Sequence, residues 1–341
     1  MNEAYKKILN RLIATIASIF GIIVITFIIT RALPGDPVWY RLSPKATQLD
    51  YLRERKRLGL DQPIFVQFIV YMQDLFMGNW GFSLAVQRDY PVWDLIATYL
   101  PRTLDVVFLS MFIAIFLGIW FGKISASHKN SIRDKIIRII GYFIISAPAF
   151  IVVLFIMEIF VHTPFKFVPL YGMKNPAYPD PPSISPSRLL DCILSGNFYL
   201  LVDYLQHLII PVAGMTLIQM VTIIRHTRVS VLEVLQMDFV RTAQAKGLKQ
   251  KIIINKHVMK NALPPVVTVS AMGFPIVLGG MIAVEYIYNY PGLGFLFREA
   301  VIRADYPLII GVIFSFSICA ILMNLIADII NIFLDPRVKL N

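Results

Sequence analysis

Six uncharged apolar runs alternate with polar segments along the chain. They lie at residues 12–30, 106–122, 139–157, 204–224, 261–284 and 306–327. Each run is close to the ~20 residues that a helix needs to cross a bilayer. None shows the alternation of a half-buried strand, and a backbone in lipid must satisfy its own hydrogen bonds, so each run predicts a helix. We expect six membrane spans, at about residues 10–31, 103–122, 137–161, 204–224, 262–285 and 306–333.

The first run shares one feature with a secretory leader, because Lys6, Lys7 and Arg11 precede it. It is too long for the apolar region of a typical leader, and "RALPGDP" follows it in place of a small-residue cleavage pattern. We therefore expect a retained helix.

Composition supports the same class of protein. Of the 341 residues, 57% are hydrophobic and 16% are charged, whereas soluble domains carry about 25% charged residues. The prediction is an all-α membrane protein in which residues 1–341 form a single polytopic domain.

The net charge of +11 would suit a nucleic-acid partner, but its distribution follows the expected topology instead. With the N-terminus inside, 18 Lys and Arg lie in the inside segments 1–11, 123–138, 225–260 and 335–341. Only 5 lie in the shorter outside segments 162–205 and 285–306. The outside loop 31–102 holds 9, but a loop beyond ~60 residues crosses largely regardless of charge. We expect both termini inside, a lipid bilayer around the chain, and no nucleic-acid partner.

Three loops interrupt the expected bundle. The extracytoplasmic insertion 31–102 has short amphipathic stretches of its own, and the extracytoplasmic loop 162–205 is too rich in proline for a regular helix. The cytoplasmic loop 225–262 has apolar residues at helical spacing up to Gly247, which can end a helix in the left-handed conformation. Helical composition resumes after the glycine, and Pro264 and Pro265 are expected to mark the start of the fifth span. This predicts a helix, a sharp turn and a second helix.

Two interpretations of this loop stay open on the residues alone. Its lysines suit an amphipathic segment resting on anionic lipid. The same pattern suits a docking element for a cytoplasmic partner, since small Ala243, Ala245 and Gly247 would let another backbone come close.

At this point the sequence resembles a known family. "RTAQAKG…H…NALPP" is similar to the cytoplasmic EAA loop of ABC-importer permeases, and more narrowly to that of the dipeptide/oligopeptide/nickel permease family. Ala243 and Gly247 match the last Ala and the Gly of the motif. Arg241 and Thr242 replace its acidic residue and first Ala, and Pro264 lies farther from the glycine than in sugar-type permeases. Both departures are similar to the peptide-type branch.

Three further stretches agree with the B-type subunit of peptide importers. They are "ITRALPGDPV" after the first span, "GNWGFSLAVQRDYPVWDLIATYLPRTL" before the second, and "EYIYNYPGLGFLFREAVIRADYPLI" between the last two. The resemblance covers nearly the whole chain and is weakest over 162–205.

The resemblance implies a type I ABC-importer permease fold in a prokaryotic cytoplasmic membrane, and import of short peptides by alternating access. It implies a second homologous permease subunit, two cytoplasmic ATPases that hold ATP and Mg, and an extracytoplasmic substrate-binding protein. A nickel chelate or an oligosaccharide is the alternative substrate. The residues expected to couple to the ATPase are Arg241, Thr242, Ala243, Ala245, Lys246, Gly247, Leu248, His257 and Asn261. Those expected to face the binding protein are Pro291, Gly292, Gly294 and Asp305.

Catalytic motifs are absent from the sequence. There is no G-x-x-x-x-G-K-[ST] to cradle a nucleotide and no H-E-x-x-H or paired-cysteine metal set. The chain is expected to be a non-catalytic subunit without a cofactor of its own. The rival class is a self-contained channel or secondary transporter, but the inverted repeat and the charged mid-membrane set that such proteins often have are not seen.

Polar and flexible positions within the spans are the remaining candidates. Glu158, Glu285 and Asp328 lie near the ends of apolar runs and are expected at the interface, within reach of water. The fifth span combines glycines with a proline that can kink a helix, which suits either tight packing between spans or a flexible gate beside the pathway. Because the resemblance implies that this span directly follows the coupling element, we expect the gate. The expected pathway residues are Gly273, Pro275, Gly279 and Gly280, with Ser146 and Pro148 in the third span as weaker candidates.

Overall fold

A computed structural model describes residues 3–32, 38, 42, 46–57, 59–163 and 167–334. Most of "RALPGDP" and the expected inside segment 335–341 lie outside the described residues. Within them every regular element is a helix, and the β-type contact is an isolated bridge between Phe82 and Pro91. The elements are α1 (Glu3–Ala32), α3 (Gln48–Arg57), α4 (Ile64–Phe76), α5 (Val92–Ser127), α6 (Ile132–Ile145), α7 (Ala149–His162), α8 (Arg188–Leu194), α9 (Phe198–Val234), α10 (Asp238–Ala245), α11 (Gln250–Ile252), the π-helix η1 (Ile253–Val258), α12 (Met259–Met272), α13 (Phe274–Ile287), α14 (Leu293–Ile302) and α15 (Tyr306–Leu334).

The membrane-spanning helices agree with the expected all-α class. Within the described chain five segments are long and apolar enough to cross a membrane: Ile8–Arg31, Val92–Ser127, Phe198–Val234, Gln250–Ile287 and Tyr306–Ile330. A sixth span forms if α6 and α7 are taken together.

The third expected span, 137–161, is not one straight helix. α6 and α7 meet at 109°. Pro148 lies directly before α7 in an extended geometry, with φ −58° and ψ 151°. A proline has no N–H for a helical hydrogen bond and disfavours helical geometry in the residue before it, so the chain turns here.

α5 and α9 form the centre of the bundle and pack at short distance. A Cβ on Gly118 would lie 2.6 Å from a side-chain carbon of Ile223, and one on Gly122 would lie 2.5 Å from Cβ of Thr227. The two glycines are four residues apart and therefore share one face of α5. Small residues at this spacing let two membrane helices approach closely, and van der Waals packing then replaces the hydrophobic driving force that lipid removes.

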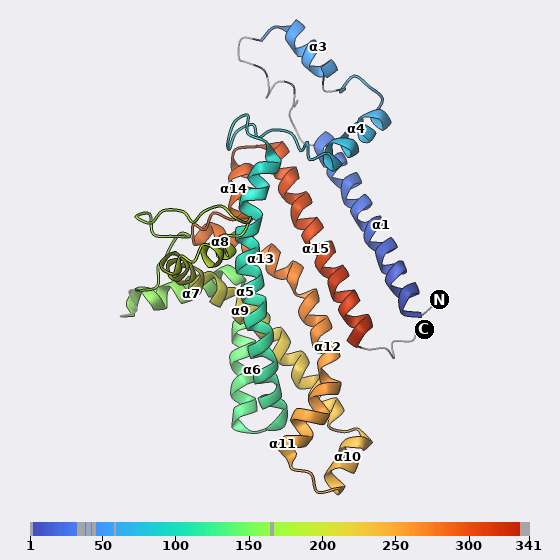
Figure 1. Cartoon of the computed structure of the whole chain (residues 1–341), viewed down its shortest axis with the longest axis vertical. Helices are drawn as coiled ribbons and strands as arrows, with labels where there is room; N and C mark the ends of the chain where they lie inside the picture. The colour runs from blue at the N-terminus through green and yellow to red at the C-terminus, as the bar shows by residue number, and fades with distance from the viewer. Residues whose placement is uncertain are drawn as a thin grey trace.

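α1 lies beside α15 at one side of the bundle (Figure 1). Arg11 and Asp328 join the two helices through an ion pair of 3.1 Å. α4 follows the upper end of α1 in this view, where the Tyr71 hydroxyl donates to Oγ1 of Thr26 at 3.0 Å. The end of the molecule that carries α10 and α11 is called the α10 end below, and the opposite one the α4 end (Figure 1).

Candidate functional site

The α10–α11 hairpin, residues 238–252, protrudes from the bundle at the α10 end (Figure 1). Its turn is fixed by two hydrogen bonds. The N–H of Leu248 donates to the carbonyl of Ala243 at 3.3 Å, and that of Gly247 donates to the carbonyl of Gln244 at 2.9 Å. With φ of +75° at Gly247, this is the Schellman arrangement that ends a helix on a left-handed glycine. The predicted helix, turn and helix are present.

One face of the hairpin is anchored to the bundle. Val240 and Ala243 are buried in an apolar cluster with Val234, Ile253 and Val258. The other face is exposed, and it carries Arg241, Thr242, Gln244, Ala245, Lys246, Gly247 and Leu248. The apolar side of the hairpin packs against the chain's own core, and its outer face is left exposed.

This placement corrects one coupling residue. Ala243 was expected to let another backbone come close at the turn, but it is 8% exposed and packs inward. Asp238 and Arg241 lie three residues apart on the exposed side, where their side chains form an ion pair of 3.4 Å. An exposed pair of this kind contributes little to stability.

His257 and Asn261 lie away from the turn. His257 is within η1 and Asn261 within α12, where its Nδ2 donates to the His257 carbonyl at 2.8 Å. Pro264 and Pro265 were expected to start the fifth span, but both lie inside α12. The helix continues because the carbonyls left without donors belong to residues 260 and 261, which are exposed.

The fifth span breaks at Gly273, between α12 and α13. Pro275 is at the start of α13, where its missing N–H costs no helical hydrogen bond. A side-chain atom on Gly273 would meet Gln219 of α9, whose amide points at the break. Nε2 of Gln219 is buried and has no hydrogen-bond partner among the described residues.

The other expected pathway residues separate into two groups. Ser146 and Pro148 lie at the bend between α6 and α7, where the Ser146 hydroxyl donates to the Phe143 carbonyl at 2.7 Å. In α13, Gly280 packs on the methyl end of Met215, whereas a Cβ on Gly279 would meet open space. The structure therefore brings the fifth-span candidates against α9 at two of their positions and leaves Gly279 unpacked.

Glu285 is the first of two buried carboxylates at the α4 end. Its Oε2 accepts from the N–H groups of Gly294 at 2.7 Å and Phe295 at 3.0 Å. Its Oε1 accepts from the Thr103 hydroxyl at 2.6 Å, and Thr103 in turn accepts from the N–H of Leu293 at 2.7 Å. The N–H groups at the start of a helix have no carbonyl partner within the helix. Glu285 and Thr103 accept three of them in α14, those of Leu293, Gly294 and Phe295. Glu285 was expected within reach of water, and this was wrong, because the residue is 0% exposed.

The turn around Glu285 explains two glycines. A Cβ on Gly292 would lie 2.3 Å from Oε1 of Glu285, and one on Gly294 would lie 2.6 Å from Cα of Ile282. Both glycines are buried, and only Pro291 of this turn is partly exposed. Gly292 and Gly294 therefore shape the loop around Glu285 and do not offer a side for a partner.

Asp305 is the second buried carboxylate. Its Oδ2 accepts from the Ser83 hydroxyl at 2.6 Å and from the N–H groups of Leu84, Ala85 and Val86 at 2.9–3.0 Å. The side chain is 0% exposed. Asp305 was expected to face a binding protein, and the structure corrects this: its carboxylate holds the segment before α5 against the start of α15.

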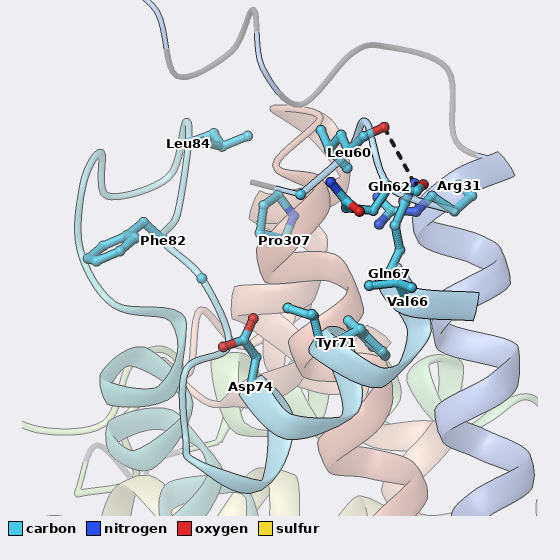
Figure 2. Close-up of a pocket in the computed structure, with 13 residues that line it drawn as sticks. Arg31, Leu60, Gln62, Val66, Gln67, Tyr71, Asp74, Phe82, Leu84 and Pro307 are labelled. Carbon is cyan, nitrogen blue, oxygen red and sulfur yellow. Dashed lines mark hydrogen bonds between the residues drawn. The ribbon is translucent and has the colours of Figure 1, made fainter. Parts of the chain in front are cut away.

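A pocket of 220 Å³ opens at the same end, between α1, α4 and the start of α15. Figure 2 shows Tyr71 and Asp74 on α4, with Phe82, Leu84 and Pro307 across the hollow. Gln67 closes one side by donating to the carbonyl of Gln62 at 2.8 Å and, more weakly, to that of Leu60 at 3.4 Å. The pocket combines an apolar lining with a few polar groups, as small binding surfaces do.

Sequence reasoning missed two polar networks inside the bundle. Asp105 on α5 accepts from the hydroxyls of Tyr204 at 3.0 Å and Ser187 at 2.6 Å, and Tyr204 also pairs with Tyr290 at 2.7 Å. The other network surrounds Asp134 and is described below. Asp105 gave a signal in the sequence, because it is an acid at the edge of the second apolar run.

The helical bundle, its bent third span, the helix junction at Gly273 in its fifth span and its protruding hairpin are those of a polytopic membrane permease. The chain belongs to the family of binding-protein-dependent transport system inner membrane components. That family matches residues 114–340, and the family of its N-terminal region matches residues 4–107. Within the described residues no group of three His, Cys, Asp or Glu is placed to hold a metal ion.

Several relatives match over almost the whole chain. A dipeptide transport system permease protein of Alkalihalophilus pseudofirmus is 36% identical over 97% of this chain and 98% of its own. A probable D,D-dipeptide transport system permease protein of Escherichia coli is 33% identical over 93% of each chain. An oligopeptide transport system permease protein of Bacillus subtilis is 32% identical over 97% of this chain and 98% of its own. The family resemblance of the sequence and the expected fold class are confirmed.

Proposed function

We propose that this chain is the membrane-spanning subunit of an ATP-driven importer that moves di- and oligopeptides across the cytoplasmic membrane. The names of its relatives support a peptide substrate, since all three are permeases for dipeptides or oligopeptides. A self-contained channel or secondary transporter has no such support. The same names favour a peptide over a nickel chelate or an oligosaccharide as the substrate.

The proposal places the α10 end in the cytoplasm, with both termini on that side. The excess of Lys and Arg in the expected inside segments supports this orientation. The chain then crosses the inner membrane with α4, α14 and the Figure 2 pocket at the extracytoplasmic side.

The observation that carries the proposal is the α10–α11 hairpin. It has a buried face that ties it to the spans and an exposed face at the tip of the molecule. A cytoplasmic ATPase that binds Arg241, Ala245 and Lys246 would move the hairpin as a unit. Because Gly247 fixes the turn and α12 continues directly from η1, such movement passes into the fifth span.

The partners follow from this arrangement. A second homologous permease subunit would complete the pathway, and two ATPases would hold ATP and Mg, so that this chain needs no cofactor. An extracytoplasmic binding protein would deliver the peptide to the α4 end. Pro291 and the rim of the Figure 2 pocket are the surfaces we propose for it, in place of the buried Asp305.

Alternating access would use the break at Gly273 and the bend at Pro148. Pro148 and Pro275 each remove one helical N–H donor, and a helix bends more easily where such a hydrogen bond is missing. ATP-driven closure would open the pathway outward, and hydrolysis would reset it.

The proposal is tested by crosslinking the hairpin tip. The full chain carrying Leu248→Cys is purified from its native membrane with the proteins that accompany it, and a reagent that couples to the thiol and carries a photoreactive group is added. We expect a crosslink to a nucleotide-hydrolysing subunit. Arg303→Cys, an exposed position at the α4 end, is the matched control and should give none. A Leu248→Cys hairpin that reacts only with lipid or detergent would refute the coupling role.

A second arm uses Gly247→Glu. The variant should insert normally but lose ATP-driven peptide uptake, because the tip is altered and the spans are not. Unchanged uptake would count against the hairpin as the coupling element. Uptake assays with a peptide library and the accompanying binding protein would then identify the substrate class.

A further inference from the structure

A groove of 300 Å³ runs between α6 and α9 in the half of the bundle nearer the α10 end. Its walls are apolar, with Ile137 and Ile145 from α6 and Val221 and Ile224 from α9. The helices nearly touch at its floor, where a Cβ on Gly141 would lie 3.3 Å from a methyl group of Val221. The groove is therefore narrow, and apolar side chains form much of its lining.

Three arginines line this groove, and Asp134 is the acid that lies near two of them. Arg228 donates to both oxygens of Asp134, at 2.8 and 3.0 Å. Nε of Arg138 lies 3.6 Å from the same carboxylate, which is too long for a hydrogen bond, and it is buried without a hydrogen-bond partner in the described chain. Arg225 is exposed and forms no ion pair with any described residue. Three positive charges and one negative charge leave an excess of two.

The surroundings of the groove are those of a lipid-facing surface. Ile136, Ile139 and Phe143 stand exposed along α6, at 50%, 66% and 76% of their surface. An uncompensated charge beside such a surface is costly unless an anion neutralises it. A guanidinium pair matches the oxygens of a phosphate, and the walls below match an acyl chain.

From this geometry we propose that the groove binds one anionic phospholipid, with its phosphate between Arg138 and Arg225 and an acyl chain along α6 and α9. The orientation proposed above places this lipid in the cytoplasmic leaflet, where acidic headgroups attract basic segments. A partner subunit is a poorer occupant, because it would have to bring an acid into the membrane to meet the excess charge.

The test is native mass spectrometry of the purified full chain with its accompanying subunits. It is titrated with phosphatidylglycerol and with phosphatidylcholine of identical acyl chains. We expect one phosphatidylglycerol to bind about thirtyfold more tightly than phosphatidylcholine, which is the scale that two interfacial arginines provide. Arg138→Gln together with Arg225→Gln should remove this preference. Arg133→Gln, an exposed arginine of α6 outside the groove, should retain it.

Several outcomes would overturn the proposal. They are equal affinity for the two lipids, an unchanged preference in the double variant, and equal protection against thermal unfolding by inorganic phosphate. A photoreactive residue in place of Tyr142, which lines the groove, should crosslink to lipid, and a crosslink to another polypeptide would also overturn it. If the double variant does not fold, Arg225→Gln alone serves, since that side chain is exposed, with Arg225→Lys expected to retain the preference. Failure of ATPase crosslinking at the hairpin would leave these measurements unaffected.

Discussion

A Cβ on Gly273 would lie 1.8 Å from Nε2 of Gln219. The backbone at the junction of α12 and α13 therefore packs directly against a side chain of α9. Gln219 is 3% exposed. The absence of a side chain at Gly273 leaves room for the Gln219 amide, and the two residues form one contact between the proposed moving helix and the centre of the bundle.

Gly273→Ala should therefore force the Gln219 amide aside. We expect a loss of about 1–3 kcal/mol in the free energy of unfolding, the usual effect of overpacking a filled site. Transport should slow as well, because the break is no longer free to change its angle. Thermal unfolding of the purified complex and peptide uptake measure the two effects.

The control is a double-mutant cycle with Gln219→Ala. Shortening the glutamine makes room for the new methyl group, so the double variant should recover most of the stability that Gly273→Ala loses. Additive losses in the double variant would show that the two residues are not coupled.

Gly247→Ala tests the hairpin turn. No atom lies within 4 Å of the added Cβ, so the effect must come from the backbone, whose φ is +75°. The left-handed conformation costs an ordinary residue about 1–2 kcal/mol. We expect faster hydrogen exchange across residues 243–252 and reduced ATP-driven uptake, with normal insertion.

Gly247→Asn is the matched variant, because asparagine adopts this conformation more readily than alanine. It should retain more uptake than Gly247→Ala. Equal losses in both variants would mean that the glycine is needed for contact with a partner and not for its conformation.

The spans and the turn at Gly247 were predictable because their causes are local. An apolar run of about twenty residues has one stable form in lipid, and a glycine after a helical pattern ends it in a known way. The bend at Pro148 also has a local cause, and Ser146 and Pro148 were among the candidates. The expectation of a continuous third span underestimated how strongly this proline acts.

The buried carboxylates were not predictable in the same way. Glu285 pairs with Thr103 and Asp305 pairs with Ser83, and these partners are 182 and 222 residues apart in sequence. Nothing near Glu285 or Asp305 in the chain indicates that partner. An acid beside an apolar run was therefore expected to face water or another protein. In the folded chain both acids are buried. Ala243 shows the same limit, since helical spacing does not say which face of α10 meets the bundle.

Glu285→Ala should destabilise the α4 end. Removing the carboxylate leaves the N–H groups of Gly294 and Phe295 buried and unpaired, and each such group costs about 1–3 kcal/mol. We expect a lower unfolding temperature and rapid hydrogen exchange in the first turn of α14. Glu158→Ala, whose side chain is 68% exposed, should behave as the wild type. The assignment fails if both variants unfold alike.

Asp305→Ala addresses the segment that leads into α5. One carboxylate oxygen accepts four hydrogen bonds from residues 83–86. A hydrogen bond to a charged group contributes about 1.5–3 kcal/mol. Four such bonds are lost together, so we expect a destabilisation larger than that of a single bond but smaller than their sum. Residues 83–86 should become cleavable by protease in the folded complex, because Asp305 is what holds them.

Asp305→Asn keeps an acceptor oxygen but not the charge, and it should give an intermediate effect. Asp61→Ala removes an exposed acid at the same end and should leave cleavage unchanged. If Asp305→Ala instead impaired only the response to the binding protein, with residues 83–86 still protected, the carboxylate would have to become accessible to that partner, against the burial seen here.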